Sequence, residues 1–449
     1  MTRVVTDYFR CPDGLPEFEI TGALSQTPGY FSFGPDVTCY GRSSSARRSK
    51  RAAGPLYDAL TDTSVSAGVV RLPLDADEII GNLRHERYQR DAGGGGIGLA
   101  DHPALRTLYY RLRDLAPRAI RRHVQKIALG DWRSISFPDW PVDGTVERFL
   151  ERLLALSMRA QGVEKVPFIW FWPAGATSCV IMTHDVEGPS GLDFCSRLMD
   201  LDDSADIKAS FQLVPERRYT VPEALLDEIR ARKFEINIHD LNHDGRLFED
   251  HDEFLRRAQR INEHARTFGA LGFRSGGLYR NHAWYDALDF SYDMSVPSTG
   301  RMEPQRGGCC SLMPFFIGQM LELPLTTTQD YVLFHILDDY SIDLWTRQLS
   351  AIKERHGLAS FLVHPDYVIE ERARTTYRAL LAHLAQMRRD HNIWFALPNE
   401  VDRWWRQRSR MRIVNDGAGP RIEGEGKERA RLAFATLTGD SVTLATEGR

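Results

Sequence analysis

The chain has 449 residues, of which 42% are hydrophobic and 26% are charged. This composition excludes a disordered chain and favours a globular protein with one large domain and smaller accessory parts. The 57 Lys and Arg residues against 61 Asp and Glu give a formal net charge of −4, so no overall positive field attracts nucleic acid. We find no apolar run near the roughly 18 residues of a membrane helix, no apolar signal-peptide core and no cysteine pattern of a disulfide framework. These features favour the cytoplasm and argue against an integral membrane protein.

Residues 1–100 are predicted to form a β-rich accessory region. Short extended pieces alternate there with Gly, Pro, Ser and Asp, the residues that end strands and form turns. The extended pieces are residues 17–20, 29–33, 37–40 and 68–74.

Residues 101–167 are predicted to form a helical bracket. Leu and Tyr recur at helical spacing from residue 105 to residue 115, and Pro117 opens a second helix. Arg and Lys cover the other faces of both helices. We therefore expect the pair to pack on the main domain, with peripheral contact to an anionic membrane as the alternative. A further amphipathic helix is predicted over 149–158.

Predicted strands alternate with predicted helices from residue 168 to residue 408. The strands are expected at 179–183, 209–214, 234–238, 272–273, 360–363 and 393–396, and the helices at 222–230, 253–268, 284–288 and 375–388. This order predicts an α/β fold with a parallel barrel, although spacing alone does not exclude an open sheet.

Residues 409–449 are predicted to form a β-rich tail. Strands at 431–436 and 441–445 flank a Gly439-Asp440 turn. We expect the tail to contact the N-terminal region, because both flank a barrel whose ends should lie near each other.

Polar side chains follow four of the predicted barrel strands. In chain order they are Asp185, Glu187, His239, His243, Arg274 and His364. In barrels of this kind, catalytic groups come from the carboxyl ends of several strands. Two imidazoles four residues apart and a carboxylate from another strand can form a three-ligand zinc site with an open position. Each motif alone is explained as well by core packing or helix capping. It is the occurrence of all of them, each directly after a predicted strand, that indicates a functional site.

In this order the motifs resemble those of the polysaccharide deacetylases, the NodB-homology group also called carbohydrate esterase family 4. Thr183-His-Asp-Val-Glu187 resembles their Thr-Phe-Asp-Asp motif, and the pair His239 and His243 resembles their His-Ser/Thr-x-x-His motif. Arg274 resembles the Arg of their Arg-x-Pro-Tyr motif, with Gly276-Gly277 where the Pro would follow. His364 ends a segment that resembles their Leu-x-x-His motif. The resemblance covers residues 168–408. Within this range, residues 168–173 and 396–405 are also similar to deacetylase-like proteins of bacterial exopolysaccharide and capsule clusters.

The resemblance implies a distorted (β/α) barrel that hydrolyses the N-acetyl amide of a sugar with a divalent metal, which we expect to be zinc. It implies Glu187, His239 and His243 as metal ligands, Asp185 as the catalytic base, Arg274 as the residue that orients the base and His364 as the general acid. Because Glu stands one position beyond the usual ligand Asp, the reverse assignment of Asp185 and Glu187 stays open.

Three further residues are candidates for the site. Asp293 is expected beside His364, where a negative charge would raise the pKa of the imidazole. Tyr279 and Trp284 are expected near the mouth of the barrel, where aromatic rings can stack on sugars, although core packing explains aromatic residues more often.

The function expected from these features is deacetylation of an N-acetylated sugar or polysaccharide intermediate, so the expected partner is a carbohydrate. Two alternatives remain. One is an amidohydrolase that acts on a small amide or ureide, and the other is a non-catalytic sugar-binding barrel in a polysaccharide assembly complex. The sequence does not indicate an oligomeric state.

Overall fold

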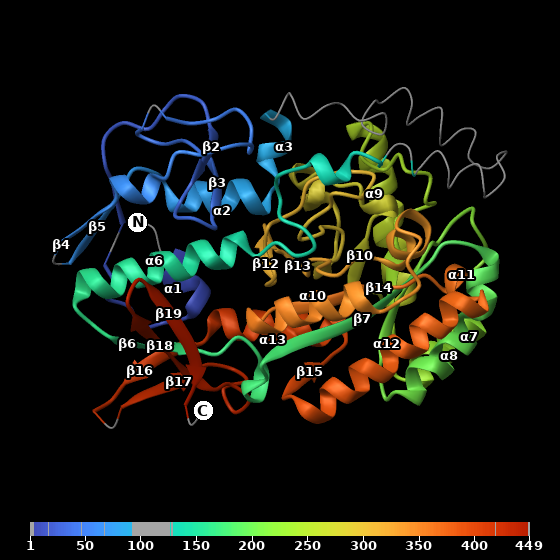
Figure 1. Ribbon diagram of the computed structural model, residues 1–449. Helices are drawn as coiled ribbons and strands as arrows, with labels where there is room; N and C mark the ends of the chain where they lie inside the picture. Colours follow the sequence, from blue (N-terminus) through green and yellow to red (C-terminus); the bar gives the residue numbers. More distant parts are fainter. Residues whose placement is uncertain are drawn as a thin grey trace.

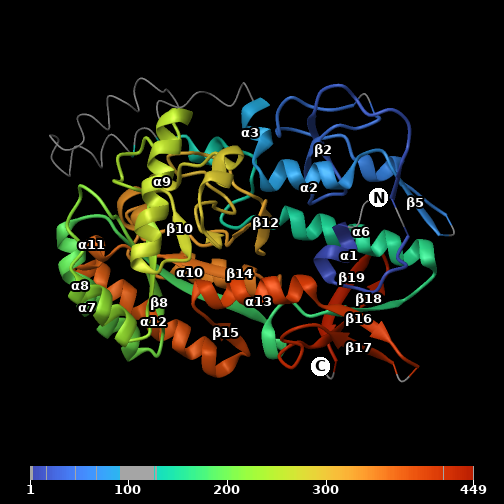
Figure 2. The same ribbon diagram turned by 180° about the vertical axis from the view of Figure 1, so that it is seen from behind.

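The computed structural model describes residues 4–91 and 129–447, apart from residues 17, 46, 67 and 418, together with residue 126. A curled β-sheet with helices around it forms one half, and the N-terminal region and the last strands of the chain lie together beside it (Figure 1, Figure 2). The two basic helices predicted after residue 102 fall outside the described residues, apart from residue 126.

In the part of the chain that the structure describes, no helix combines the length and the apolar composition needed to span a bilayer.

The central sheet has nine strands in the order β12-β13-β11-β10-β9-β8-β7-β14, with β15 also paired to β7. They are β7 (Ser178–Val186), β8 (Ala209–Leu213), β9 (Glu235–His239), β10 (Gly272–Arg274), β11 (Tyr292–Asp293), β12 (Phe315–Ile317), β13 (Met320–Glu322), β14 (Leu358–Leu362) and β15 (Ile393–Phe395). All pairs are parallel except β12 with β13. The six strands predicted for the barrel are confirmed. β7, β8, β9 and β14 are buried along their whole length, as expected of strands covered on both faces.

The predicted α/β barrel is confirmed as a curled sheet that side chains help to close. β14 ends the strand order on one side, and the loop after β13 reaches it through two threonines. Thr326 Oγ1 donates to the carbonyl of Leu358 at 2.6 Å and accepts from the N–H of Ser360 at 2.9 Å. Thr327 Oγ1 donates to the carbonyl of Ser360 at 2.7 Å. These contacts satisfy backbone groups on the edge of β14 that no neighbouring strand covers there.

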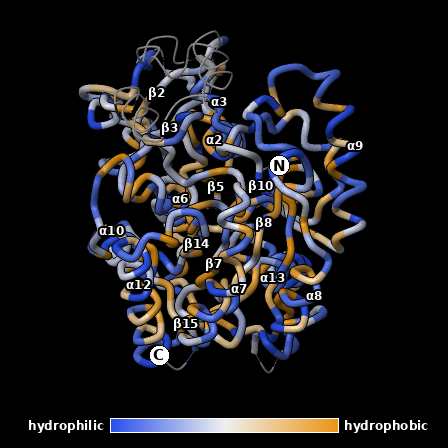
Figure 3. The backbone as a smooth tube through the Cα atoms, turned by 90° about the vertical axis from the view of Figure 1, so that its right-hand side faces the viewer, coloured by the Kyte–Doolittle hydropathy of each residue, from blue (hydrophilic) through white to orange (hydrophobic). Residues whose placement is uncertain are grey.

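Amphipathic helices connect and cover the strands. They are α7 (Pro189–Ser204), α8 (Glu223–Ala231), α9 (His251–Phe268), α10 (Asp343–Glu354), α11 (Pro365–Val368), α12 (Glu371–Asp390) and α13 (Pro398–Arg410). The residues that α9 buries recur every three or four positions, and its trace in Figure 3 alternates between hydrophobic and hydrophilic segments. The helices predicted at 222–230, 253–268 and 375–388 are confirmed. In place of the helix predicted at 284–288 there is a 3₁₀ helix, η6 (His282–Ala287), which ends before Leu288.

The N-terminal region contains helices as well as the predicted strands. The strands are β1 (Phe18–Ile20), β2 (Gly29–Ser32), β3 (Thr38–Gly41), β4 (Ser64–Ser66) and β5 (Val69–Leu72), and the helices are α1 (Val4–Phe9), α2 (Ala76–Arg84) and α3 (Arg87–Asp91). These helices were not expected from the sequence. Asp75 starts α2 by accepting hydrogen bonds from the N–H groups of Asp77 and Glu78, a capping signal that the sequence contained.

Helix α6 (Thr145–Gln161) joins the N-terminal region to the last strands and contains the helix predicted over 149–158. It runs between the two in both Figure 1 and Figure 2. Its Phe149 ring packs against Phe33 of the N-terminal region, with ring centroids 5.2 Å apart. Strand β6 (Lys165–Ile169) follows and pairs with the tail.

The tail consists of two hairpins, and its predicted strands are confirmed. β16 (Arg412–Asn415) pairs with β17 (Pro420–Glu423), and β18 (Leu432–Thr438) pairs with both β19 (Ser441–Thr446) and β6. The expected contact between the two ends is present. Arg10 donates to the carbonyl of Met411 in the tail at 2.9 Å. Arg408 of α13, just before the tail, donates to the carbonyl of Tyr8 at 3.0 Å. Buried residues from both ends belong to one hydrophobic cluster.

The bridge to β14 can be tested with Thr326→Val, which keeps the shape of the side chain and removes its hydroxyl. We expect the free energy of unfolding in urea to fall by about 1–3 kcal/mol, because the buried Leu358 carbonyl and Ser360 N–H lose their partner. Thr375→Val on the exposed face of α12 is the matched control and should change it by less than about 0.5 kcal/mol. Equal effects of the two changes would contradict the bridge.

Candidate functional site

The alternation of side chains along β7 decides which of its polar residues enter the site. Thr183 and Asp185 lie on one face of the strand and His184 on the other. His184 Nε2 lies 2.9 Å from Oδ2 of Asp202 in α7, and its Nδ1 lies 3.0 Å from the carbonyl of Val363. Tyr377 donates to the same Asp202 carboxylate. His184 therefore anchors β7 to its surroundings and is not a member of the site.

The three predicted metal ligands come together at the ends of β7 and β9. Nε2 of His243 lies 3.0 Å from Oε1 of Glu187, and Nε2 of His239 lies 3.8 Å from the same oxygen. One ligand atom from each residue lies within 4.8 Å of the others. Ligand atoms about 2.0–2.2 Å from a tetrahedral ion are about 3.3–3.6 Å apart. One divalent ion therefore fits among them with small side-chain movements.

The orientation of His239 supports this fit. Its Nδ1 lies 3.1 Å from the carbonyl of Arg274, and because a carbonyl only accepts, Nδ1 carries the proton. This hydrogen bond leaves Nε2 as the atom with a lone pair for a metal. Nε2 is buried and has no hydrogen-bond partner among the residues that the structure describes. Two imidazoles and a carboxylate are also the donor set of many catalytic zinc sites.

Asp185 lies beside this group and is paired with Arg274. Nη1 of Arg274 donates to Oδ1 of Asp185 at 2.8 Å, and the other carboxylate oxygen lies 3.5 Å from Nε2 of His239. Burial alone would raise the pKa of Asp185, but the charge of Arg274 lowers it below its ordinary value. The buried carboxylate is therefore ionised. Arg274 is where the sequence predicted it, in contact with the predicted base.

Glu187 rather than Asp185 is the carboxylate within hydrogen-bond distance of a histidine of the cluster. Burial would raise the pKa of Glu187, but the charge of the neighbouring His243 lowers it well below its ordinary value. Glu187 is thus also ionised and suited to hold a cation. Of the two assignments left open by the sequence, this geometry fits Glu187 as ligand and Asp185 as its neighbour.

The carboxylate that pairs with His364 is Asp330, not the predicted Asp293. Nδ1 of His364 lies 2.6 Å from Oδ1 of Asp330, and the His364 N–H donates to the other oxygen at 2.7 Å. Burial lowers the pKa of His364, but Asp330 and then Glu187 raise it well above its ordinary value. Nε2 of His364 points towards the metal ligands and lies 3.5 Å from Oε1 of Glu187. Asp330 lies at the start of the short helical segment that continues into η7 (Val332–Ile336), 34 positions before His364, where no sequence pattern indicated it.

Asp293 forms a different buried pair. It is the register partner of Glu322 on the neighbouring parallel strand, so the two carboxyl groups lie side by side. Ser295 Oγ donates to Asp293 at 2.6 Å, and Glu322 accepts the N–H of Val296 at 3.0 Å. Burial raises the pKa of Asp293. Burial and the neighbouring Asp293 carboxyl raise the pKa of Glu322 well above its ordinary value. The prediction placed Asp293 by its sequence neighbourhood, whereas strand register directs its side chain to Glu322.

Gly276 explains why the motif after Arg274 lacks a proline. A Cβ atom at Gly276 would lie 2.5 Å from Oδ2 of Asp240 and 3.0 Å from the ring of His243. The next residue, Gly277, has a φ of 62°, which favours glycine. The two glycines therefore let the loop after β10 pass directly against a predicted metal ligand.

The two aromatic candidates differ in their surroundings. Tyr279 lines a cavity between the barrel and the N-terminal region. Trp284 instead packs on Phe254 and Phe248, with ring centroids 5.3 and 6.1 Å away, and on His251 at 5.0 Å. Trp284 does not line the cavity, so its contacts are those of a residue that holds η6 on α9.

No protein-family model matches the chain, and no curated protein matches it by sequence. Its structure is similar to a Mycobacterium smegmatis protein assigned as a polysaccharide deacetylase, with 20% identity over 53% of this chain and 93% of that one, at a TM-score of 0.43. An allantoinase matches with 13% identity over 52% and 92%, at a TM-score of 0.41. A Pseudomonas aeruginosa protein assigned as a polysaccharide deacetylase matches with 11% identity over 51% and 91%, at a TM-score of 0.41. The structural similarity to these proteins covers about half of the chain.

The metal site is tested by metal content. We expect the purified protein, after incubation with zinc and dialysis, to retain one ion per chain, and His243→Ala to lose it because one of three ligands is removed. The exposed His391→Ala is the matched control and should retain the ion. Elemental mass spectrometry measures the number of zinc ions per chain in the wild type and the two variants. Equal zinc content in all three would exclude this site.

The Asp293–Glu322 pair should make stability depend on pH. Between the ordinary carboxyl pKa of about 4 and the raised pKa of Glu322, the folded protein holds a proton that the unfolded chain has released. The free energy of unfolding therefore falls as pH rises through this window. Glu322→Gln should flatten this fall, because an amide stays uncharged and can donate to Asp293.

The measurement is the free energy of unfolding in urea of the wild type and of Glu322→Gln, at pH values from about 5 to about 8. A tenfold change in proton affinity corresponds to about 1.4 kcal/mol, which sets the scale of the expected difference. Parallel pH profiles for the wild type and Glu322→Gln would show that this pair does not share a proton in the folded state.

Proposed function

We propose that this protein is a zinc-dependent hydrolase that removes the acetyl group from an N-acetylated sugar, either free or within a polysaccharide intermediate. The observation that carries the proposal is the arrangement of three groups around one buried point. A candidate ligand set of Glu187, His239 and His243 lies between the ionised Asp185 and the protonated imidazole of His364. Amide hydrolysis requires this combination, because a water must lose a proton and the leaving amine must gain one.

Glu187, His239 and His243 would hold the metal in this proposal. A zinc ion in such a site polarises the acetyl carbonyl and lowers the pKa of a water molecule towards about 7.

Asp185 accepts the proton of the attacking water. Its Oδ1 is occupied by Arg274 at 2.8 Å, whereas Oδ2 faces the ligand group. Oδ2 is therefore the atom that takes the proton. Arg274 keeps the carboxylate ionised and fixes its orientation, so that Asp185 is a base at neutral pH although it is buried.

His364 donates a proton to the departing amine. Asp330 holds its Nδ1 and favours the charged ring, so the transferable proton is the one on Nε2, on the side of Glu187. Without this proton the leaving group would depart as an amide anion, which is a very poor leaving group. The acid and the base thus come from β7 and from the end of β14, which are neighbouring strands.

The mechanism is tested by replacing the acid. We expect His364→Ala to lower kcat for acetate release from N-acetylated amino-sugar oligosaccharides by roughly 10²–10⁴-fold, the usual effect of losing a general acid. Zinc content should not change, because His364 is not among the proposed ligands. His391→Ala, on the exposed start of the segment before β15, is the control and should keep wild-type kcat.

The outcome also separates the alternatives. A His364→Ala protein with wild-type turnover would contradict the mechanism. A wild-type protein that releases ammonia or opens a cyclic ureide, but releases no acetate, would be an amidohydrolase on small amides. A protein that binds sugars, retains no metal and releases no acetate would be a sugar-binding barrel.

A further inference from the structure

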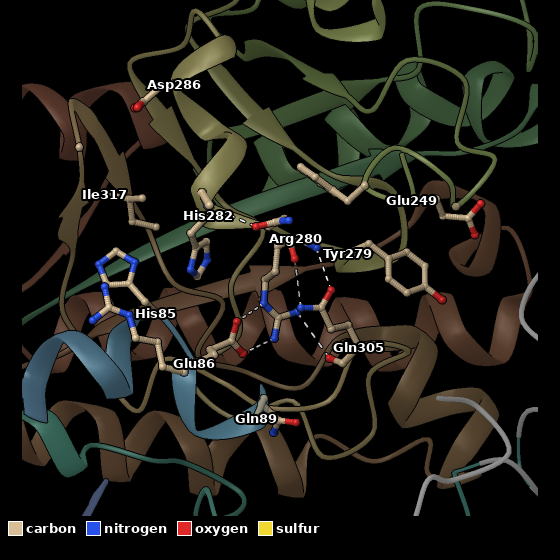
Figure 4. Close-up of a pocket in the computed structure, with 16 residues that line it drawn as sticks. His85, Glu86, Gln89, Glu249, Tyr279, Arg280, His282, Asp286, Gln305 and Ile317 are labelled. Carbon is tan, nitrogen blue, oxygen red and sulfur yellow. Dashed lines mark hydrogen bonds and ion pairs between the residues drawn. The ribbon is translucent and has the colours of Figure 1, made fainter. Parts of the chain in front are cut away.

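A cavity of about 530 Å³ lies between the N-terminal region and the barrel (Figure 4). One wall is formed by His85, Glu86, Arg87 and Gln89, from the end of α2 into α3. The other walls are formed by lining residues within 245–249, 279–286, 305 and 317–318 of the barrel region. The volume is within the range of about 300–1,000 Å³ found for small-molecule sites. The mechanism proposed above does not use this cavity.

The wall between the two regions is held by a buried ion pair. Nε of Arg280 donates to Oε2 of Glu86 at 2.5 Å, and a second guanidinium nitrogen donates to the other oxygen (Figure 4). The remaining Nη1 donates to the carbonyl of Leu278 at 2.7 Å, and Glu86 also accepts the N–H of Gly308 at 2.6 Å. Because both charges are used within the protein, this pair shapes the cavity without attracting an ion.

The other lining groups suit an uncharged, hydroxyl-rich ligand. Gln89 offers an exposed amide that can both donate to and accept from hydroxyl groups, and Tyr279 offers an aromatic ring. Burial lowers the pKa of His85 to about 4, so this imidazole is neutral near pH 7.

The charges of the described lining residues give the cavity no positive excess that would favour an anionic ligand. Beyond the Glu86–Arg280 pair, the charged lining residues in the part of the chain that the structure describes are Arg87, Glu249 and Asp286. Arg87 donates to the side chain of Asn82 at 3.3 Å. Arg246 Nε lies 3.9 Å from the Glu249 carboxylate, so these charges nearly balance and give phosphate, sulfate and uronic acid groups no positive field to bind.

The cavity and the candidate metal site are bordered by the same loop. The loop after β10 begins with Gly276 against the ring of His243 and continues to Tyr279, Arg280 and Asn281 in the cavity wall. On the other side, Gly245 lines the cavity two positions after His243. The same short segments therefore border both places.

We propose that this cavity binds uncharged sugar residues of the substrate next to the one that is deacetylated, and that the N-terminal region supplies part of this binding site. This inference rests on the proposed function, since it takes the metal site to act on a sugar. It gives the N-terminal region a role in substrate selection: a neutral, hydroxyl-rich glycan fits, and an anionic glycan or a sugar nucleotide does not.

The test is binding to an array that carries neutral N-acetylated, neutral non-acetylated and acidic oligosaccharides. Asp185→Asn serves as the background, because it removes the base and prevents turnover during the measurement. We expect this protein to bind neutral N-acetylated oligosaccharides and not acidic ones. Adding Gln89→Trp, which fills the cavity from an exposed position of α3, should weaken binding at least tenfold.

The matched control is Gln26→Trp, an exposed position of the same region outside the cavity, which should bind like the background protein. Exclusive binding of acidic glycans, no binding to the array, or equal binding with and without Gln89→Trp would overturn the inference.

Failure of the proposed deacetylase function can be distinguished from failure of the inference about the cavity. If Gln89→Trp abolishes glycan binding while the wild type releases no acetate and retains no zinc, the cavity binds sugar but the deacetylase function is wrong. If the wild type releases acetate and Gln89→Trp leaves both KM and kcat unchanged, the deacetylase function stands and the cavity has no part in it.

Discussion

The buried guanidinium of Arg274 is the group on which the rest of the site depends. Its Nε donates to the carbonyl of Met294 at 2.9 Å, and its Nη1 donates to Thr183 and to Asp185, both at 2.8 Å. Its own carbonyl accepts the hydrogen bond from the ring of His239. A fully buried charge is tolerated only when it is paired and hydrogen-bonded. The ends of β7, β9 and β11 must therefore meet around β10 in this one register, which is also the register that brings the polar side chains together.

Two ion pairs then give neighbouring groups opposite protonation states. Arg274 keeps Asp185 ionised, and Asp330 keeps His364 protonated, although burial alone would favour the neutral form of both. When the surroundings of two titratable groups move their pKa values apart, one becomes the base and the other the acid. The division of tasks in the proposed mechanism is thus a property of the partners that the fold supplies, because an isolated Asp and His have pKa values only a few units apart.

The accessory parts belong to the same folded body as the barrel. Helix α6 packs between the two ends of the chain, and the buried guanidinium of Arg408 donates to backbone carbonyls in both α1 and β6. The Glu86–Arg280 pair joins the N-terminal region to the loop that also touches His243. Removing either end would therefore expose apolar surface of the shared core and leave Arg280 or Arg408 without its partners, so the barrel is not expected to be independent of them.

The sequence by itself determined the features that depend on near neighbours in the chain. Apolar runs and turn residues located the barrel strands, because strand periodicity is local. The positions of Asp185, Glu187, His239 and His243 after those strands followed, since the carboxyl ends of parallel strands meet at one edge. Only the tertiary structure decided the pairs between distant segments. Asp330 rather than Asp293 contacts His364, two threonines close the sheet edge, and residues 85–89 form a wall of the cavity. Such contacts depend on strand register and loop paths across long sequence separations, which no local pattern specifies.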